Sequence, residues 1–257
     1  MELLHSNVIG DSGIPFVILH GFLGTGDNWK TLGKRYSALG YQVHSLDQRN
    51  HGKSFHSNDF NYQVLAEDVV HYCNQYKLEH IVLLGHSMGG KVAMHIAACY
   101  PKLVDKLIIA DIAPRFYPLH HQTILEGLLA IDFEEVNTRQ MAEVILDKYV
   151  QDIGTRQFLL KNLYWQAPSK LGWRMNLHVL INNIDEIGKA LPEMYSINCP
   201  SLFLKGSRSD YINQTDELMI INQFHRAQIQ TISNAGHWLH AENPEAFFQA
   251  VVTFLGK

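Results

Sequence analysis

Short runs of apolar residues alternate with amphipathic helical patterns along the first hundred residues of the chain. The runs typical of buried strands are Phe16–Gly21, Tyr41–Asp47, His80–Gly85 and Val104–Asp111. The helical patterns between them cover Asn28–Gly40, Val64–Tyr76 and Lys91–Tyr100. Strands separated by helices need crossover connections, so the pattern predicts an α/β fold with a mostly parallel central sheet flanked by helices.

The strand pattern stops at about Pro114 and resumes near Cys199. Between these points the residues favour helices at Thr123–Ala130, Thr138–Val150, Gly154–Tyr164 and Trp173–Ala190. Two more strand patterns and a last helix follow, at Cys199–Gly206, Ala227–Ser233 and Pro244–Leu255. We therefore expect one discontinuous core, made of residues 1–113 and 195–257, with an all-helical insertion at 114–194.

Composition narrows the classes of protein to consider. The chain has 257 residues and a formal net charge of −4, which does not favour nucleic acid or an anionic membrane as a partner. Its only cysteines are Cys73, Cys99 and Cys199, an odd number that argues for a reducing compartment. Without a leader-like start or a long apolar run, a cytoplasmic protein is expected. The sequence predicts neither a metal, since no Cys/His cluster has ligand spacing, nor a cofactor.

The stretch "GHSMG", from Gly85 to Gly89 with Ser87 and Met88 inside it, lies between a predicted buried strand and a predicted helix. The pattern G-x-S-x-G in this context is typical of a nucleophile elbow, in which a sharp turn lifts the serine hydroxyl clear of the sheet. Glycines at the two flanking positions allow close approach of neighbouring backbone. Ser87 is therefore the candidate nucleophile, whereas a tight turn with an idle serine would not need this residue here.

A serine hydroxyl is a weak nucleophile at neutral pH and needs a base. His237 follows the last predicted strand and precedes the final helix, in the stretch "NAGHWLHAENP". The chain order of serine and then histidine agrees with this architecture. His240 is the rival, with a structural or rim role as its simpler interpretation.

The base in turn needs an acid that orients it. Two aspartates follow predicted strands: Asp111 after Val104–Asp111, and Asp210 after Cys199–Gly206. The usual acid lies about three residues beyond the glycine of the second loop, where this chain has Ser209, and Asp210 comes one residue later. Both aspartates remain candidates on spacing alone, with a capping role or a solvated loop as the alternatives.

The oxyanion that forms during acyl transfer needs hydrogen-bond donors. The stretch "LHGFLGTGDNW" follows the first predicted strand, and the N–H of Phe22 is a natural first donor. The N–H of Met88, next to the nucleophile, is the expected second donor. A phosphate-binding loop is not indicated, because no Lys-Ser or Lys-Thr pair follows these glycines.

Together these motifs resemble the α/β-hydrolase superfamily, and within it the YbfF-type bacterial esterases. The resemblance covers essentially the whole chain and rests on "DQRNHGKS", "GHSMGGKVAM", "DIAP" and "NAGHWLHAENP". Asn50 replaces the glycine that is usual in the first of these. The resemblance implies a Ser-His-Asp hydrolase of carboxylic esters, with acyl-CoA thioesters as further candidates, and an insertion that forms a lid. It also favours Asp111, in "DIAP", over Asp210 as the acid.

The lid supplies candidate substrate-binding residues. Arg115, His120 and His121 lie at its start, where they could meet a charged acyl group, or could simply be surface residues of a hinge. Trp165 belongs to a set of lid aromatics suited to an acyl pocket, although helical aromatics are more often core.

The function expected from these residues is serine-dependent hydrolysis of a small-molecule ester or thioester through an acyl-enzyme. A lyase or a C–C bond hydrolase on the same scaffold is the alternative, because a scaffold does not fix the reaction. An interaction module with a relic site is a third hypothesis, which a complete serine, histidine and acid set disfavours. Neither acyl length nor oligomeric state follows from the sequence.

Overall fold

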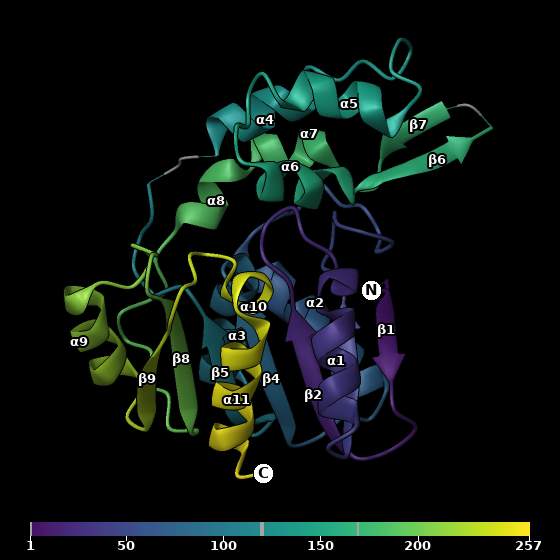
Figure 1. Cartoon of the computed structure of the whole chain (residues 1–257). Helices are drawn as coiled ribbons and strands as arrows, with labels where there is room; N and C mark the ends of the chain where they lie inside the picture. The colour runs from purple at the N-terminus through teal and green to yellow at the C-terminus, as the bar shows by residue number, and fades with distance from the viewer. Residues whose placement is uncertain (1, 119–120, 169) are drawn as a thin grey trace.

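Seven strands form one twisted sheet in the order β1-β3-β2-β4-β5-β8-β9 (Figure 1). All neighbouring pairs are parallel except β1 and β3. This computed structural model describes residues 2–118, 121–168 and 170–257. The strands are β1 Ser6–Ile9, β2 Ile14–Leu19, β3 Tyr41–Leu46, β4 Ile81–His86, β5 Val104–Ala110, β8 Ser201–Gly206 and β9 Ala227–Ile232. The predicted mostly parallel sheet is confirmed.

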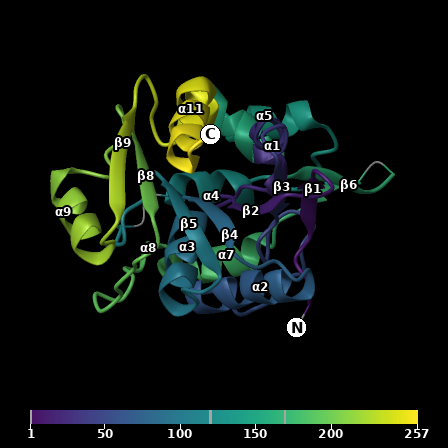
Figure 2. The ribbon, with the colours of Figure 1, turned by 90° about the horizontal axis from the view of Figure 1, so that it is seen from below.

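Helices cover both faces of the sheet. α1 Lys30–Ser37 and α11 Pro244–Leu255 lie on one face, and α2 Tyr62–Gln75 and α3 Met88–Cys99 lie on the other, as the view from below shows (Figure 2). Two apolar clusters correspond to these faces, one around Phe16, Tyr36 and Phe247 and a larger one around Leu83 and Val92. The central strand β4 is buried at all six positions because it has helices on both sides.

Several elements of the core were not predicted from the sequence pattern. The short edge strand β1 and the helix α9 Gln214–Gln223 were not expected, and neither was the 3-10 helix Gly26–Trp29 or the short helix α10 Leu239–Glu242. α9 begins with a capping box, in which Asn213 and Asp216 bond to each other's backbone N–H groups. This strong local signal fixes the start of α9 even though its apolar face is narrow.

The segment between β5 and β8 lies above the carboxyl ends of the parallel strands (Figure 1). Its helices are α4 Gln122–Leu129, α5 Arg139–Leu146, α6 Ile153–Leu160, α7 Leu177–Asn182 and α8 Ile184–Gly188. Ligands in open α/β sheets bind at this edge. The insertion therefore covers the edge of the sheet where a substrate is expected to bind. Its limits at residues 114 and 194 remain a prediction from the sequence.

The expectation of an all-helical insertion is wrong at one place. β6 Leu163–Ala167 and β7 Lys170–Trp173 form an antiparallel hairpin, where helices were predicted to end and to begin. Leu163 pairs with Trp173, and Trp173 donates its indole N–H to the carbonyl of Leu128. The aromatic residues that suggested amphipathic helices here instead follow the pleat of a short, half-exposed ribbon.

Among the described residues, no helix has both the length and the apolar character that crossing a bilayer requires.

Candidate active site

Ser87 occupies a sharp turn between β4 and α3. Its backbone has φ 51° and ψ −118°, a conformation that residues other than glycine rarely adopt. A Cβ atom on Gly85 would lie 2.2 Å from the carbonyl oxygen of Gly89, and one on Gly89 would lie 2.5 Å from the carbonyl oxygen of Leu19. The two glycines are therefore needed for the turn to form, and the turn projects the serine side chain above the sheet.

Asp111 and His237 form a hydrogen-bonded pair next to this turn. The Asp111 carboxylate lies 2.8 Å from Nδ1 of His237, although 126 residues separate them in sequence. Asp111 is fully buried and follows β5 with φ 53°, so its backbone is also in the left-handed region. A buried carboxylate at Nδ1 keeps the proton on that nitrogen and leaves Nε2 free to accept one.

Two further donors hold the carboxylate of Asp111. The N–H of Gly206 donates to Oδ1 over 3.0 Å, and the hydroxyl of Ser209 donates to Oδ2. Asp210, the other candidate acid, has an exposed side chain. The loop after β8 therefore contributes a serine to the buried site, and the carboxylate comes from β5.

The imidazole of His237 is also fixed from two other directions. The ring of Tyr211 stacks on it, with centroids 3.8 Å apart and planes inclined by 16°. The ring of His86 bonds through Nε2 to the backbone carbonyl of His237 over 2.9 Å. The stacking and the Asp111 bond orient the imidazole, and the His86 bond anchors the backbone that carries it, as an acid–base group requires.

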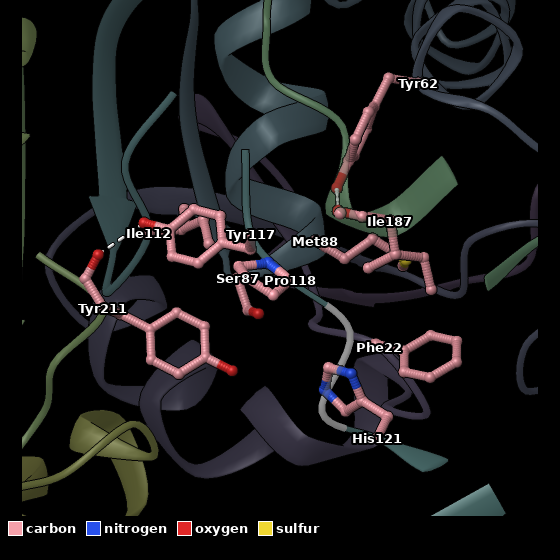
Figure 3. A pocket seen from close by; sticks show the side chains of 11 residues that line it. Phe22, Tyr62, Ser87, Met88, Ile112, Tyr117, Pro118, His121, Ile187 and Tyr211 are labelled. Atoms are coloured by element: carbon pink, nitrogen blue, oxygen red, sulfur yellow. Dashed lines mark hydrogen bonds between the residues drawn. The ribbon is translucent and has the colours of Figure 1, made fainter. Parts of the chain in front are cut away.

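Ser87 lies where two cavities meet. His237 and Ser87 both line a cavity of about 170 Å³, which we call the outer pocket. Ser87 also lines a narrower cavity together with Tyr62, Met88 and Ile187, which we call the inner pocket. In Figure 3 the serine hydroxyl points into open space bordered by Tyr211, His121 and Phe22.

The backbone next to Ser87 supplies two candidate oxyanion donors. Phe22 and Met88 both line the inner pocket with Ser87. In the described parts of the chain, neither of their N–H groups donates a hydrogen bond. Met88 is the first residue of α3, so its N–H is one of the helix-start groups that have no partner within the helix.

Two buried histidines hold the loop that carries Phe22. His20 accepts from the Gln48 N–H at Nε2 over 3.0 Å, and its Nδ1 lies 2.8 Å from the carbonyl of Gly21. His51 accepts from the N–H of Leu23 at Nε2 over 3.3 Å, and its Nδ1 lies 2.9 Å from the carbonyl of Arg49. Each ring thus bonds as a neutral imidazole with its proton on Nδ1.

Burial reinforces this neutral state. It lowers the pKa of His20 to about 4 and that of His51 to about 3, with the neighbouring His20 adding a smaller lowering effect on His51. Burial likewise lowers the pKa of His240 to about 3. His240 stacks on Trp29 with centroids 4.2 Å apart, and the histidine that bonds to Asp111 is His237, so the structure gives His240 a packing role.

Asn50 departs from the resembled pattern without disturbing the loop that contains it. Its φ is 63°, a value that glycine adopts freely and that asparagine tolerates best among other residues. Its side chain accepts from the N–H of Ser57 and donates to the same residue's carbonyl, both over 2.9 Å. These two bonds offset the conformational cost of the replacement.

The structure does not bring the two predicted substrate-binding residues to the pockets at Ser87. Arg115 forms an ion pair with the buried Asp216 over 2.8 Å and lies over the ring of Tyr117. Trp165 is 59% exposed on β6. Neither residue lines the inner or the outer pocket. His121 lines both pockets, and His120 lies outside the described residues.

Sequence reasoning missed several residues that shape the site, among them Ser209 as a hydrogen-bond partner, Tyr211, His20 and His51. Ser209 could have been found, because it stands at the position where the acid was sought. The others contact the site through stacking or backbone bonds, which leave no spacing signal. In the described part of the chain, no three His, Cys, Asp or Glu side chains gather as metal ligands would.

Comparisons with known proteins agree with this architecture. Residues 14–244 match the family model described as alpha/beta hydrolase fold. The chain is 32% identical to Esterase YbfF of Escherichia coli, over 94% of this chain and 92% of that protein. It is 39% identical to the sn-1-specific diacylglycerol lipase ABHD11 of Danio rerio, over 96% of this chain and 79% of that protein.

A solved structure titled Marine microorganism esterase is similar over 99% of this chain and 100% of its own, with a TM-score of 0.96 and 39% identity. The long sequence matches and the shared fold lead to one conclusion: the chain belongs to the α/β-hydrolase family.

Proposed function

We propose that the protein is a serine hydrolase that cleaves carboxylic esters through an acyl-enzyme. Ser87 acts as the nucleophile, His237 as the general base and Asp111 as the group that orients His237. The N–H groups of Phe22 and Met88 stabilise the oxyanion. The observation that carries the proposal is the hydrogen bond between the buried Asp111 and His237, at a cavity that Ser87 also lines.

The first half of the reaction acylates the enzyme. The hydroxyl oxygen of Ser87 attacks the ester carbonyl while Nε2 of His237 takes the hydroxyl proton. The imidazolium that forms is stabilised by the carboxylate of Asp111. The carbonyl oxygen becomes an oxyanion, which accepts hydrogen bonds from the two backbone N–H groups. Collapse of this intermediate breaks the bond to the alcohol oxygen, and His237 returns the proton to that oxygen.

The second half repeats these steps with water. His237 removes a proton from a water molecule, whose oxygen attacks the acyl carbon on Ser87. The second tetrahedral intermediate breaks the bond to the Ser87 oxygen, and His237 reprotonates the serine. The carboxylic acid leaves, and the enzyme returns to its starting state.

The names of the relatives support an ester substrate. One is named an esterase and another a diacylglycerol lipase, and both align over nearly all of this chain. Thioesters such as acyl-CoA follow the same chemistry, because a thiolate replaces the alkoxide as leaving group. A matched pair of an oxygen ester and a thioester of one acid separates these two substrate classes.

A lyase or a C–C bond hydrolase is the alternative on this scaffold. A fluorophosphonate labels a serine only if that serine is activated as a nucleophile. We expect one label, on Ser87, together with hydrolysis of phenyl acetate. Ser87→Ala should lose both, and His237→Ala should lose turnover by several orders of magnitude.

His80→Gln is the matched control, because His80 is an exposed histidine whose ring bonds to Asp105. It should leave both signals unchanged. A protein that hydrolyses no ester and takes no label on Ser87 contradicts the proposal.

A further inference from the structure

The two cavities that meet at Ser87 differ greatly in size. The inner pocket has a cavity volume of about 20 Å³ and the outer pocket one of about 170 Å³. A cavity of about 10–15 Å³ is needed to hold one water molecule. The inner pocket therefore has room for a very small group, and the outer pocket for a chain of several atoms.

Acid–base chemistry assigns one part of the substrate to each cavity. The leaving oxygen receives its proton from His237, so the leaving group must lie on the histidine side of Ser87. His237 lines the outer pocket and not the inner one. Of the two candidate oxyanion donors, Met88 lines the inner pocket alone and Phe22 lines both pockets, so the inner pocket is the cavity on the far side of Ser87 from His237. The acyl chain therefore extends into the inner pocket, and the alcohol extends into the outer pocket.

We propose, building on the ester hydrolysis proposed above, that the enzyme selects esters of small carboxylic acids with long-chain alcohols. The acyl group is of acetyl or propionyl size, and the alcohol is the larger part of the substrate.

Hydrogen bonds hold the inner pocket at its small size. The hydroxyl of Tyr62 donates to the carbonyl of Ile187 in the insertion over 2.6 Å. The hydroxyl of Tyr117 accepts from the N–H of Ala113 over 2.8 Å and donates to the carbonyl of Tyr211 over 2.5 Å. Figure 3 shows the Tyr62 and Tyr117 bonds on opposite sides of the pocket. Widening the pocket for a longer acyl chain would break these hydrogen bonds.

A buried lysine ties the same wall to the helix that follows the nucleophile. Lys91 of α3 is fully buried, and its Nζ donates to the carbonyls of Arg115, Gly188 and Lys189. The first of these carbonyls lies where the chain enters the insertion, and the other two where α8 ends. Lys91 thus links the segment that enters the insertion to the segment that leaves it, which opposes their separation.

The outer pocket continues into more space. Thr155, Phe158 and Trp238 line both the outer pocket and a neighbouring groove of about 600 Å³ between α6 and α10. Apolar side chains line part of the outer pocket, among them Leu23, Ile124 and Leu159. An alkyl chain can therefore bury its first carbons in the outer pocket. The groove beyond is lined mostly by polar side chains, among them Asp152, Lys161 and Glu242, so it gives room for the end of the chain next to solvent.

Two isomeric esters test this asymmetry in the unmodified protein. Hexyl acetate and ethyl hexanoate contain the same atoms, but the long chain is on the alcohol in the first and on the acid in the second. We expect kcat/KM for hexyl acetate to exceed that for ethyl hexanoate by at least about tenfold. Equal values, or a preference for ethyl hexanoate, would overturn the proposed selectivity while leaving ester hydrolysis intact.

Failure of the proposed function gives a different result. Neither isomer, nor phenyl acetate, would then be hydrolysed, and Ser87 would take no fluorophosphonate label. If phenyl acetate is hydrolysed and hexyl acetate is not, the function stands and the proposed selectivity is wrong.

Two matched truncations test the assignment of the pockets. Ile187→Ala enlarges the inner pocket and should raise the ratio of ethyl hexanoate to hexyl acetate turnover by roughly threefold or more. Phe158→Ala removes a wall of the outer pocket and should lower kcat/KM for hexyl acetate mainly through KM. The reverse pattern, in which Phe158→Ala improves turnover of ethyl hexanoate, would overturn the assignment. Ile187→Val provides a milder change with the same expected direction.

Discussion

The hydroxyl of Ser209 donates a hydrogen bond to the carboxylate of Asp111. Ser209 stands in the loop after β8, where the acid of such a site is usually sought, and Asp111 stands at the end of β5. The carboxylate thus comes from β5, the neighbour of β8 in the sheet. The hydroxyl of Ser209 occupies the place after β8 where the acid was sought. Within the part of the chain that the structure describes, the carboxylate of Asp111 receives hydrogen bonds from Ser209, Gly206 and His237.

Replacing the buried acid should disable the histidine. Asp111→Asn is expected to lower kcat by roughly 10⁴, because the amide favours the wrong tautomer of His237 and cannot stabilise its charged form. Asp210→Asn is the matched control and should cost less than about tenfold, because its side chain is exposed. Steady-state kinetics on one aryl ester, with circular dichroism as a folding check, measures both. The opposite ranking would return the acid to the loop after β8.

Removing the Ser209 hydroxyl should have a smaller effect on the same step. Ser209→Ala takes one donor from a charged, buried acceptor, and we expect kcat to fall by roughly tenfold with little change in KM. Ser207→Ala is the control in the same loop, because its side chain is exposed. A loss shared equally by both variants would show that the effect comes from the loop and not from Asp111.

Acid should destabilise the fold through its buried histidines. Burial holds the pKa of His20 near 4 and that of His51 near 3, below the usual 6.5, so both are neutral when folded and take up protons when unfolded. Between about pH 6.5 and 4 the unfolded state binds more protons, and the free energy of unfolding falls as the pH falls. Each histidine contributes a slope of up to about 1.4 kcal/mol per pH unit.

Urea denaturation at a series of pH values from 7.5 to 4.5 measures this slope. The stability gained from the neutral rings is complete above the unfolded pKa and is lost towards the folded pKa. These two rings hold the loop that carries Phe22. Enzyme activity should therefore be lost over the same pH range as the folded state. A free energy of unfolding that is constant from pH 7 to pH 5 would contradict this account.

Much of the fold followed from the sequence because its strands are short apolar runs with clear stops. The segments predicted for β3, α2, β5 and α11 overlap closely with the observed elements. β1 was missed because an edge strand is only half buried and shows no apolar run. The hairpin β6-β7 was missed because five-residue and four-residue strands rich in aromatic residues cannot be told from helix ends by periodicity.

In the candidate site, too, residues in local motifs could be predicted, and residues that depend on tertiary contacts could not. Ser87 lies in a local motif whose flanking glycines have a visible steric reason, and His237 lies between the last strand and the last helix, so sequence alone could select both. The choice between Asp111 and Asp210 depends on how two loops distant in sequence fold towards one histidine. A local sequence pattern cannot predict that arrangement. Arg115 was selected for its charge, but Asp216 on α9, an element that was not predicted, neutralises it.

The central claim is that Ser87 carries the acyl group during turnover. The most direct measurement is peptide mass spectrometry of enzyme quenched in acid during hydrolysis of an activated acetate ester. The account predicts an acetyl group on the peptide that contains Ser87, increased when Asp111→Asn slows deacylation more than acylation, and absent from Ser87→Ala. An acetyl group on another residue, or turnover by Ser87→Ala at a rate near that of the unmodified protein, would contradict it.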